Sequence, residues 1–189
     1  MRELSLHVLD IVENAIEAGA SRVEVMIEED LEQDRLTIDV RDNGRGMSQE
    51  MIQRVMDPFC TTRTTRHVGL GLPLFAAAAR RCDGDLVIES EPGRGTRLRA
   101  HFRHSHVDRA PLGDMAGAML AVLLSERAVD LNYTHRAGGQ EFRFDSAEIR
   151  KELEDVPLTH PRVREWLSDA LREGEANLPS VETDRRLTF

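Results

Sequence analysis

Apolar residues recur every three or four positions along residues 3–18, which predicts an amphipathic helix that stops at Gly19. At 100° per residue, four apolar side chains fall on one stripe: Leu4, Val8, Ile11 and Ala15. Residues 22–29 and 34–42 instead alternate apolar and polar positions, and an acidic turn joins them. These two segments therefore predict an antiparallel β-hairpin.

The pattern changes twice more before residue 105. Residues 48–57 predict a short helix with Ser48 as its N-cap, and residues 72–82 predict an apolar helix. Residues 84–104 alternate again and turn at residues 92–95, which predicts a second hairpin. A helix, a hairpin, two helices and a further hairpin are typical of a two-layer α/β sandwich.

A second region of α+β character begins near residue 107. Its pattern predicts a helix at 111–126, a hairpin at 129–145, and amphipathic helices at 146–155 and 160–174. The predicted units are an N-terminal domain, a smaller C-terminal α+β region for a partner or for oligomerisation, and a flexible tail: residues 1–106, 107–175 and 176–189.

Composition narrows the function classes. The net charge of −9 argues against nucleic-acid binding, and all basic residues except Lys151 are arginine. The two cysteines, Cys60 and Cys82, are too few for a disulfide framework and suit a reducing compartment. The N-terminus lacks the apolar core of a signal peptide, and the longest apolar run, 116–124, is too short to span a bilayer. We therefore expect a cytoplasmic protein without a membrane anchor.

Candidate chemistry begins with Asp10 and Asn14, which are neighbours on one helix face, away from the apolar stripe. An isolated pair of this kind is typical of surface decoration. Asp42 follows a strand and enters Asn-Gly-Arg-Gly, where Gly44 and Gly46 allow positive φ and close approach to a flat base. Asn-Gly is also a common hairpin turn, so this motif alone is weak.

Two more glycine motifs follow. "GLGL" at 69–72 opens a helix, where backbone N–H groups and the helix dipole favour phosphate. "GRGT" at 93–96 returns through the second hairpin and places Thr96 at a strand start.

Five motifs in this order resemble the ATP-binding domain shared by DNA gyrase, heat-shock chaperones, histidine kinases and mismatch-repair ATPases, the GHKL or Bergerat superfamily. "LDIVENAIEAGAS" resembles the N box, "DPFCTT" the kinase-type F box, and "DNGRGM", "GLGL" and "GRGT" the three glycine boxes. The resemblance covers about residues 2–103. It is closest to histidine kinases after the first glycine box and closer to mismatch-repair ATPases in "ENAIEAGAS". It implies a sandwich of the Bergerat type, with a mixed sheet covered on one face by helices.

The resemblance implies ATP and Mg²⁺ as cofactors. Asn14 would coordinate the Mg²⁺ that bridges the phosphates, and Asp42 would bind the adenine amine with Thr96 nearby through water. Residues 57–68 would form a lid that is mobile without nucleotide and ordered with it. The other implied nucleotide contacts are Gly44, Gly46, Met47, Arg63, Gly69, Leu70, Gly71 and Leu72.

Two positions depart from the family pattern. Hydrolysing members have a glutamate general base one turn before the asparagine, whereas this chain has Asp10, which is shorter by one methylene. Asp10 is the catalytic candidate, and its shorter reach predicts slow hydrolysis. Arg63 stands where histidine kinases often have lysine, and both Arg63 and Arg66 could contact phosphate or remain solvated.

Other reactive side chains favour structural readings. His7 could orient Asp10, but a capped, partly buried imidazole is favoured. The spacing of His101, His104 and His106 matches no standard zinc pattern. Cys60 could sense redox state, although packing beside Phe59 is favoured, and helical spacing places Trp166 in the core.

The sequence favours a stand-alone, Mg²⁺-dependent ATP-binding regulatory protein with a histidine-kinase-type catalytic domain that acts in trans on a protein partner. A phosphoacceptor helical hairpin is not expected, because the first helix starts at residue 3. One alternative is a non-catalytic, ATP-gated interaction module of the anti-sigma kind. Another is a weak ATPase clamp of the mismatch-repair kind. The whole chain, including "FRFDSAEIRKELEDVPLTHP", also resembles uncharacterised stand-alone bacterial ATP-binding proteins, and this resemblance suggests a redox or hydrogenase-associated partner. A homodimer remains open.

Overall fold

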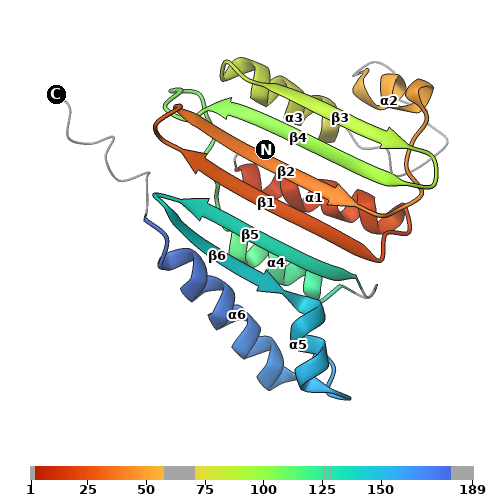
Figure 1. Cartoon of the computed structure of the whole chain (residues 1–189), viewed down its shortest axis with the longest axis vertical. Coiled ribbons are helices and arrows are strands. Elements are labelled where there is room, and N and C mark those ends of the chain that lie inside the picture. The colour runs from red at the N-terminus through yellow and green to blue at the C-terminus, as the bar shows by residue number, and fades with distance from the viewer. Residues whose placement is uncertain (1–2, 58–70, 126, 128, 180–189) are drawn as a thin grey trace.

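The computed structural model describes residues 3–57, 71–125, 127 and 129–179. Over these ranges, the chain forms one six-stranded sheet with the order β3-β4-β2-β1-β5-β6 (Figure 1). The strands are β1 (Arg22–Asp30), β2 (Arg35–Asp42), β3 (Asp85–Glu91), β4 (Gly95–Arg103), β5 (Asp130–Ala137) and β6 (Gln140–Asp145). The helices are α1 (Leu4–Glu17), α2 (Gln49–Met56), α3 (Gly71–Arg81), α4 (Met115–Leu123), α5 (Ser146–Leu153) and α6 (Pro161–Ala176).

The sheet is mixed and has one covered face, as the sequence predicts. Neighbouring strands are antiparallel except β1 and β5, which are parallel. Helices α1, α3 and α4 lie behind the sheet, so the structure is a two-layer α/β sandwich (Figure 1). Alternation along the strands sends Val25, Ile38 and Leu98 into the core beneath these helices.

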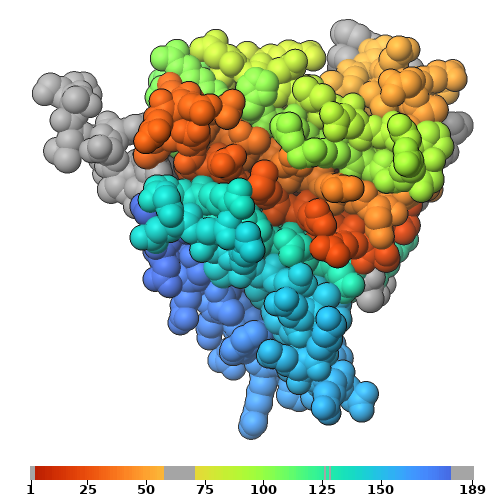
Figure 2. All heavy atoms as spheres, viewed as in Figure 1, coloured from red at the N-terminus to blue at the C-terminus, as the bar shows by residue number. Residues whose placement is uncertain are grey.

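Figure 2 shows the open face of the sheet. This face carries the alternate, polar positions of the strands. Asp39 lies at its centre and accepts hydrogen bonds from Arg97 and Arg99 of the neighbouring strand. These bonds hold the pKa of Asp39 below its ordinary value, although burial of the carboxylate opposes them. Asp42, the last residue of β2, lies on the covered face instead and does not take part in these bonds.

The predicted elements of the first hundred residues are confirmed. All four residues of the predicted stripe on α1 are buried, and Gly19 after the helix has φ +82°. Ser48 caps α2 by accepting a hydrogen bond from the Met51 amide at 3.2 Å. The predicted lid, with Cys60, Arg63 and Arg66, lies outside the described residues apart from Asp57.

The C-terminal region extends the same sheet. Strand β5 pairs with β1 in parallel, with Tyr133 opposite Val25, and β6 forms the new edge. Helix α4 packs between α1 and α6 and continues the helical layer. The core is therefore continuous across residue 106, and the functional division at that position stays a prediction.

Three predictions for the C-terminal elements need correction. Helix α4 begins at Met115 rather than near residue 111, because Gly113 has φ +77° and Asp114 caps the helix. Trp166 is 53% exposed, because the buried stripe of α6 runs through Val163, Leu167 and Leu171 and the indole lies beside it. Helix α6 also continues past the predicted end at residue 174 to Ala176, the first residue of the predicted tail, and residues 180–189 lie outside the described ranges. No helix in the described ranges has both the length and the apolar character needed to cross a bilayer.

Candidate functional site

Asp42 lies at the end of β2, where the strand enters the first glycine loop. Its Oδ1 accepts a hydrogen bond from the Gly44 amide at 2.7 Å. Burial raises the pKa of Asp42 above its ordinary value, although hydrogen bonds from the Gly44 and Thr96 amides oppose this shift. The result is a fixed, half-buried acceptor at the end of the strand.

Close backbone contacts explain the glycines around Asp42. Gly46 has φ +65°, and a Cβ at this position would lie 1.9 Å from the Glu91 carbonyl oxygen. A Cβ on Gly95 would lie 2.0 Å from the carbonyl oxygen of Asp42. The first and third glycine motifs therefore touch through backbone atoms, which any larger residue would separate.

Gly44 corrects one detail of the sequence prediction. Positive φ occurs at Gly46 but not at Gly44. A Cβ on Gly44 would instead approach Asp42 Oδ1 to 2.9 Å and the Ala18 carbonyl oxygen to 3.1 Å. Glycine is needed here for space beside α1 rather than for backbone conformation.

Ser90 joins the two glycine loops, a role that sequence reasoning missed. Its hydroxyl oxygen accepts a hydrogen bond from the Met47 amide at 2.8 Å and lies 2.9 Å from both the Gly95 carbonyl oxygen and Thr96 Oγ1. The serine of the "IESEPGRGT" segment was the available signal, but its partners become visible only in the folded chain. Ser90 therefore fixes Met47 and Thr96, both of which the resemblance places beside the nucleotide.

We expect Ser90→Ala to destabilise the protein by about 1–3 kcal/mol, because the Met47 amide loses its acceptor, the hydroxyl of the buried Ser90. Urea unfolding measures this change. Ser105→Ala is a less informative comparison, because Ser105 is exposed. Ser146→Ala is the matched control for Ser90→Ala, because it also removes a buried hydroxyl that accepts a hydrogen bond from a backbone amide, that of Leu131. Both should lose stability, but only Ser90→Ala should also weaken nucleotide binding.

A cavity of about 670 Å³ opens beside these residues, within the usual size range of small-molecule sites. Its lining includes Asp42, Ser90, Gly95 and Thr96, with Ile88 as an apolar side chain, and also charged side chains, among them Arg41, Glu89 and Arg97. The carboxylate of Asp42 and the hydroxyl groups beside it can pair with a base that carries an exocyclic amine.

The second half of the site lies on α1. Asn14 Nδ2 donates a long hydrogen bond of 3.5 Å to Asp10 Oδ2, so the pair is held together on one face. Burial raises the pKa of Asp10 above its ordinary value, while the Asn14 hydrogen bond opposes the shift. A Cβ on Gly71 would lie 1.7 Å from Asp10 Oδ2, so this carboxylate packs directly against the first residue of α3.

Helix α1 links the two halves. The Ala18 carbonyl oxygen at its end accepts a hydrogen bond from the Arg45 amide at 3.0 Å, which seats the first glycine loop on the helix. From Asp10 to Ala18 the helix axis rises ~12 Å. One rigid element therefore sets the separation between Asp42 with its loop and the Asp10–Asn14 pair with α3.

This donor set fits both implied cofactors. The amide oxygen of Asn14 and the carboxylate of Asp10 are hard oxygen ligands of the type that Mg²⁺ prefers. The start of α3 at Gly71 is suited to a phosphate, because its first backbone N–H groups lack partners within the helix. Leu72, in that first turn, packs partly buried against the core, whereas Arg63, Gly69 and Leu70 lie outside the described residues.

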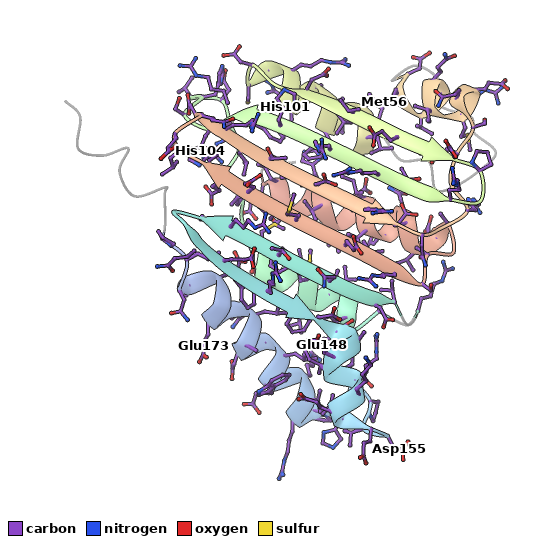
Figure 3. The ribbon with its side chains drawn as sticks, in the orientation of Figure 1. Met56, His101, His104, Glu148, Asp155 and Glu173 are labelled. Carbon is purple, nitrogen blue, oxygen red and sulfur yellow. The ribbon has the colours of Figure 1, made fainter. Side chains whose placement is uncertain are left out.

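The histidines fall in different places. His7 is buried and stacks on Phe75 with ring centroids 4.9 Å apart, and burial lowers its pKa to about 4. Its burial agrees with the prediction of a structural imidazole. Nδ1, however, has no hydrogen-bond partner among the described residues, so the predicted capping hydrogen bond is not seen at this atom. His101 and His104 lie toward the end of the sheet away from Met56 and α2 (Figure 3).

Comparison with known proteins agrees with this geometry. The family model described as "Histidine kinase-, DNA gyrase B-, and HSP90-like ATPase" matches residues 2–106. Similar proteins include Sporulation kinase C of Bacillus subtilis (strain 168), 36% identical over 88 residues, which are 47% of this chain and 20% of that protein. Sensor protein kinase FleS of Pseudomonas aeruginosa is 43% identical over 89 residues, again 47% of this chain and 22% of the relative.

The matched segment thus spans about a fifth of these two relatives. The family model's match over residues 2–106 contains all the described residues of the site, from Asp10 on α1 to Thr96 on β4. A match over more than half of the chain, together with the mixed sheet and the paired glycine loops, gives one conclusion. The chain belongs to the family of histidine kinase-, DNA gyrase B- and HSP90-like ATPases.

Proposed function

We propose that this chain is an Mg²⁺-ATP-binding regulatory protein whose histidine-kinase-type catalytic domain acts in trans on a protein partner. The observation that carries the proposal is the arrangement of two acceptor sites along α1. Asp42 lies beside a cavity at one end, and the Asp10–Asn14 pair lies against the start of α3. Both sites include contacts that require glycine: backbone contacts at Gly46 and Gly95 beside Asp42, and the Asp10 carboxylate at Gly71.

In this proposal, Asp42 accepts a hydrogen bond from the adenine amine, and Thr96 assists through water. Asn14 holds Mg²⁺, which neutralises phosphate charge during transfer. The start of α3 at Gly71 supplies backbone N–H donors to the phosphates. The acceptor side chain comes from the partner, and the ATP-binding domain contributes position and charge stabilisation.

The kinase names of the relatives support phosphotransfer as the leading reaction. The crowding of Asp10 favours the second candidate, a non-catalytic module in which ATP binding changes partner affinity. The Asp10 carboxylate is hydrogen-bonded to Asn14 and packed against Gly71. These contacts restrict its access to a water molecule that it would have to activate as a general base.

Calorimetry with ATP, in the presence and absence of Mg²⁺, tests the proposal. We expect micromolar affinity that needs Mg²⁺ for full strength, and we expect Asn14→Ala to lose chiefly the Mg²⁺-dependent part. Asn132→Ala is the matched control, because Asn132 lies on β5 and pairs with Asp145 far along the sheet. Equal Mg²⁺ dependence in wild type and Asn14→Ala would contradict the metal assignment.

A second measurement separates the two candidate functions. Proteins that the chain captures in the presence of ATP are incubated with γ-labelled ATP, and label on the partner is measured. Transfer that Asn14→Ala abolishes supports the kinase, whereas ATP-dependent capture without transfer supports the non-catalytic module. If the chain captures no protein and transfers no label, action in trans is contradicted.

A further inference from the structure

A row of buried ionisable groups crosses the junction between β1, β5 and α6. His135 on β5 is central: its Nδ1 lies 3.0 Å from Glu175 Oε2 on α6, and its Nε2 lies 3.2 Å from Glu29 Oε1 on β1. Tyr133 donates its hydroxyl to Glu175 at 2.7 Å. His135 is 4% exposed, so these groups meet inside the protein.

Charge complementarity holds this row together. Burial opposes charge on His135, but its bonds to Glu175 and Glu29 raise its pKa to about 9. Burial likewise opposes charge on Glu29, but hydrogen bonds from His104 and His135 lower its pKa to about 2. A cationic imidazole therefore lies between two carboxylates near neutral pH.

The row continues toward the nucleotide helix. The other oxygen of Glu29 lies 2.7 Å from His104 Nε2, just beyond the end of β4. The backbone oxygen of His104 accepts a hydrogen bond of 2.6 Å from Arg109, which is 6% exposed and also donates to the Ala110 carbonyl. The buried contacts thus reach the segment that leads to residues 111–113.

Residues 111–113 pack against the first turn of α1 and accept hydrogen bonds from its backbone amides. The Leu4 amide donates to the Pro111 carbonyl at 3.0 Å, and the Ser5 amide donates to the Leu112 carbonyl at 2.8 Å. Glu3 precedes the helix without a side-chain cap, so these carbonyls satisfy amides that a helix start leaves without partners. A Cβ on Gly113 would meet Ser5 Oγ at 2.7 Å, which shows how closely the segment fits.

We propose that the C-terminal region positions the nucleotide helix α1 through this row of contacts, from Glu175 through His135, Glu29, His104 and Arg109 to residues 111–112. Helix α4, packed between α6 and α1, supports the same link through apolar contacts. A partner that moves α6 thereby changes the first turn of α1, two turns before Asn14. The effect on nucleotide affinity rests on the proposed function, whereas the mechanical link does not.

Amide hydrogen exchange of the nucleotide-free protein, followed by NMR, tests the link. Glu175→Gln keeps the side-chain shape but removes the charge that faces His135. We expect exchange at the Leu4 and Ser5 amides to accelerate about tenfold, while exchange at Ile38 in the centre of the sheet changes less than about twofold. Glu173→Gln is the matched control, since it makes the same change on the same helix at an exposed position (Figure 3), and should leave all three rates unchanged.

Arg109→Gln cuts the row close to α1 and should accelerate the same two amides at least as strongly. Unchanged exchange at Leu4 and Ser5 in both variants overturns the proposal, as does a uniform acceleration across the protein. In wild type and Glu175→Gln, calorimetry with ATP then measures the functional consequence, expected as a severalfold loss of affinity. If wild type binds no ATP, the proposed function fails, but the exchange data still decide the link.

A pH series on the wild-type protein provides a second measurement. A group whose pKa is raised on folding contributes stability below its unfolded pKa of about 6.5, and that stability is lost as pH rises through the folded value. Protection of Leu4 and Ser5, corrected for intrinsic exchange, should therefore fall as pH rises from 6.5 through about 9. The same series on His135→Gln should show no such fall, and an equal fall in both proteins would contradict the role of His135.

Discussion

Asp42→Ala should lower the affinity for ATP about 100-fold, the largest loss expected from a single side chain of the site. The substitution removes the acceptor for the adenine amine, and a hydrogen bond to a charged group contributes about 1.5–3 kcal/mol. It also releases the Gly44 amide, which Asp42 Oδ1 holds at 2.7 Å, so the loop that approaches the base loses an anchor. Calorimetry with Mg²⁺-ATP measures the loss directly.

Asp39→Ala is the matched control for Asp42→Ala. Asp39 lies on the same strand but on the open face, where it binds Arg97 and Arg99. Asp39 does not line the cavity itself, although its partner Arg97 does. We expect this control to lose stability while it keeps ATP affinity within about threefold. Unchanged ATP binding by a folded Asp42→Ala protein would remove Asp42 from the base site.

Local patterns predicted the elements of the fold because they depend on nearby residues. The stripe of Leu4, Val8 and Ile11 can be buried only if residues 4–17 form a helix against a core, and the hairpins follow from strict alternation. The parallel pairing of β1 with β5 could not be predicted in this way. It joins segments about a hundred residues apart, and neither strand carries a signal for its neighbour.

The same distinction applies to the site. Asp42, Asn14 and the glycine motifs could be chosen as candidates because their order along the chain resembles a known family. The sequence predicts positive φ at Gly44, and this is wrong. Glycine is needed there because a Cβ would crowd the backbone of Ala18, which follows α1. The bridging role of Ser90 and the link from His135 to α1 likewise exist only where distant segments meet.

The contact between Asp10 and Gly71 is such a tertiary feature, and its expected effect is large. An alanine Cβ at position 71 would overlap Asp10 Oδ2, at 1.7 Å, so Gly71→Ala must displace the carboxylate or the start of α3. Overpacking of this kind costs about 1–3 kcal/mol. Because the displaced group belongs to the proposed Mg²⁺ and phosphate end of the site, ATP turnover and affinity should fall with stability.

A double-mutant cycle isolates this contact. Asp10→Ala removes the overlapping oxygen, so adding Gly71→Ala to Asp10→Ala should cost little stability, and the coupling free energy should be about 1–3 kcal/mol. Ala77→Gly in the exposed part of α3 is the matched control; it should cost about 0.5–1 kcal/mol in either background, since Ala77 does not face Asp10. Urea unfolding of the six proteins, with wild type as the reference, gives both cycles. Additive effects of Asp10→Ala and Gly71→Ala would show that the carboxylate and α3 are independent, and Asp10 would then be free to reach water as a general base.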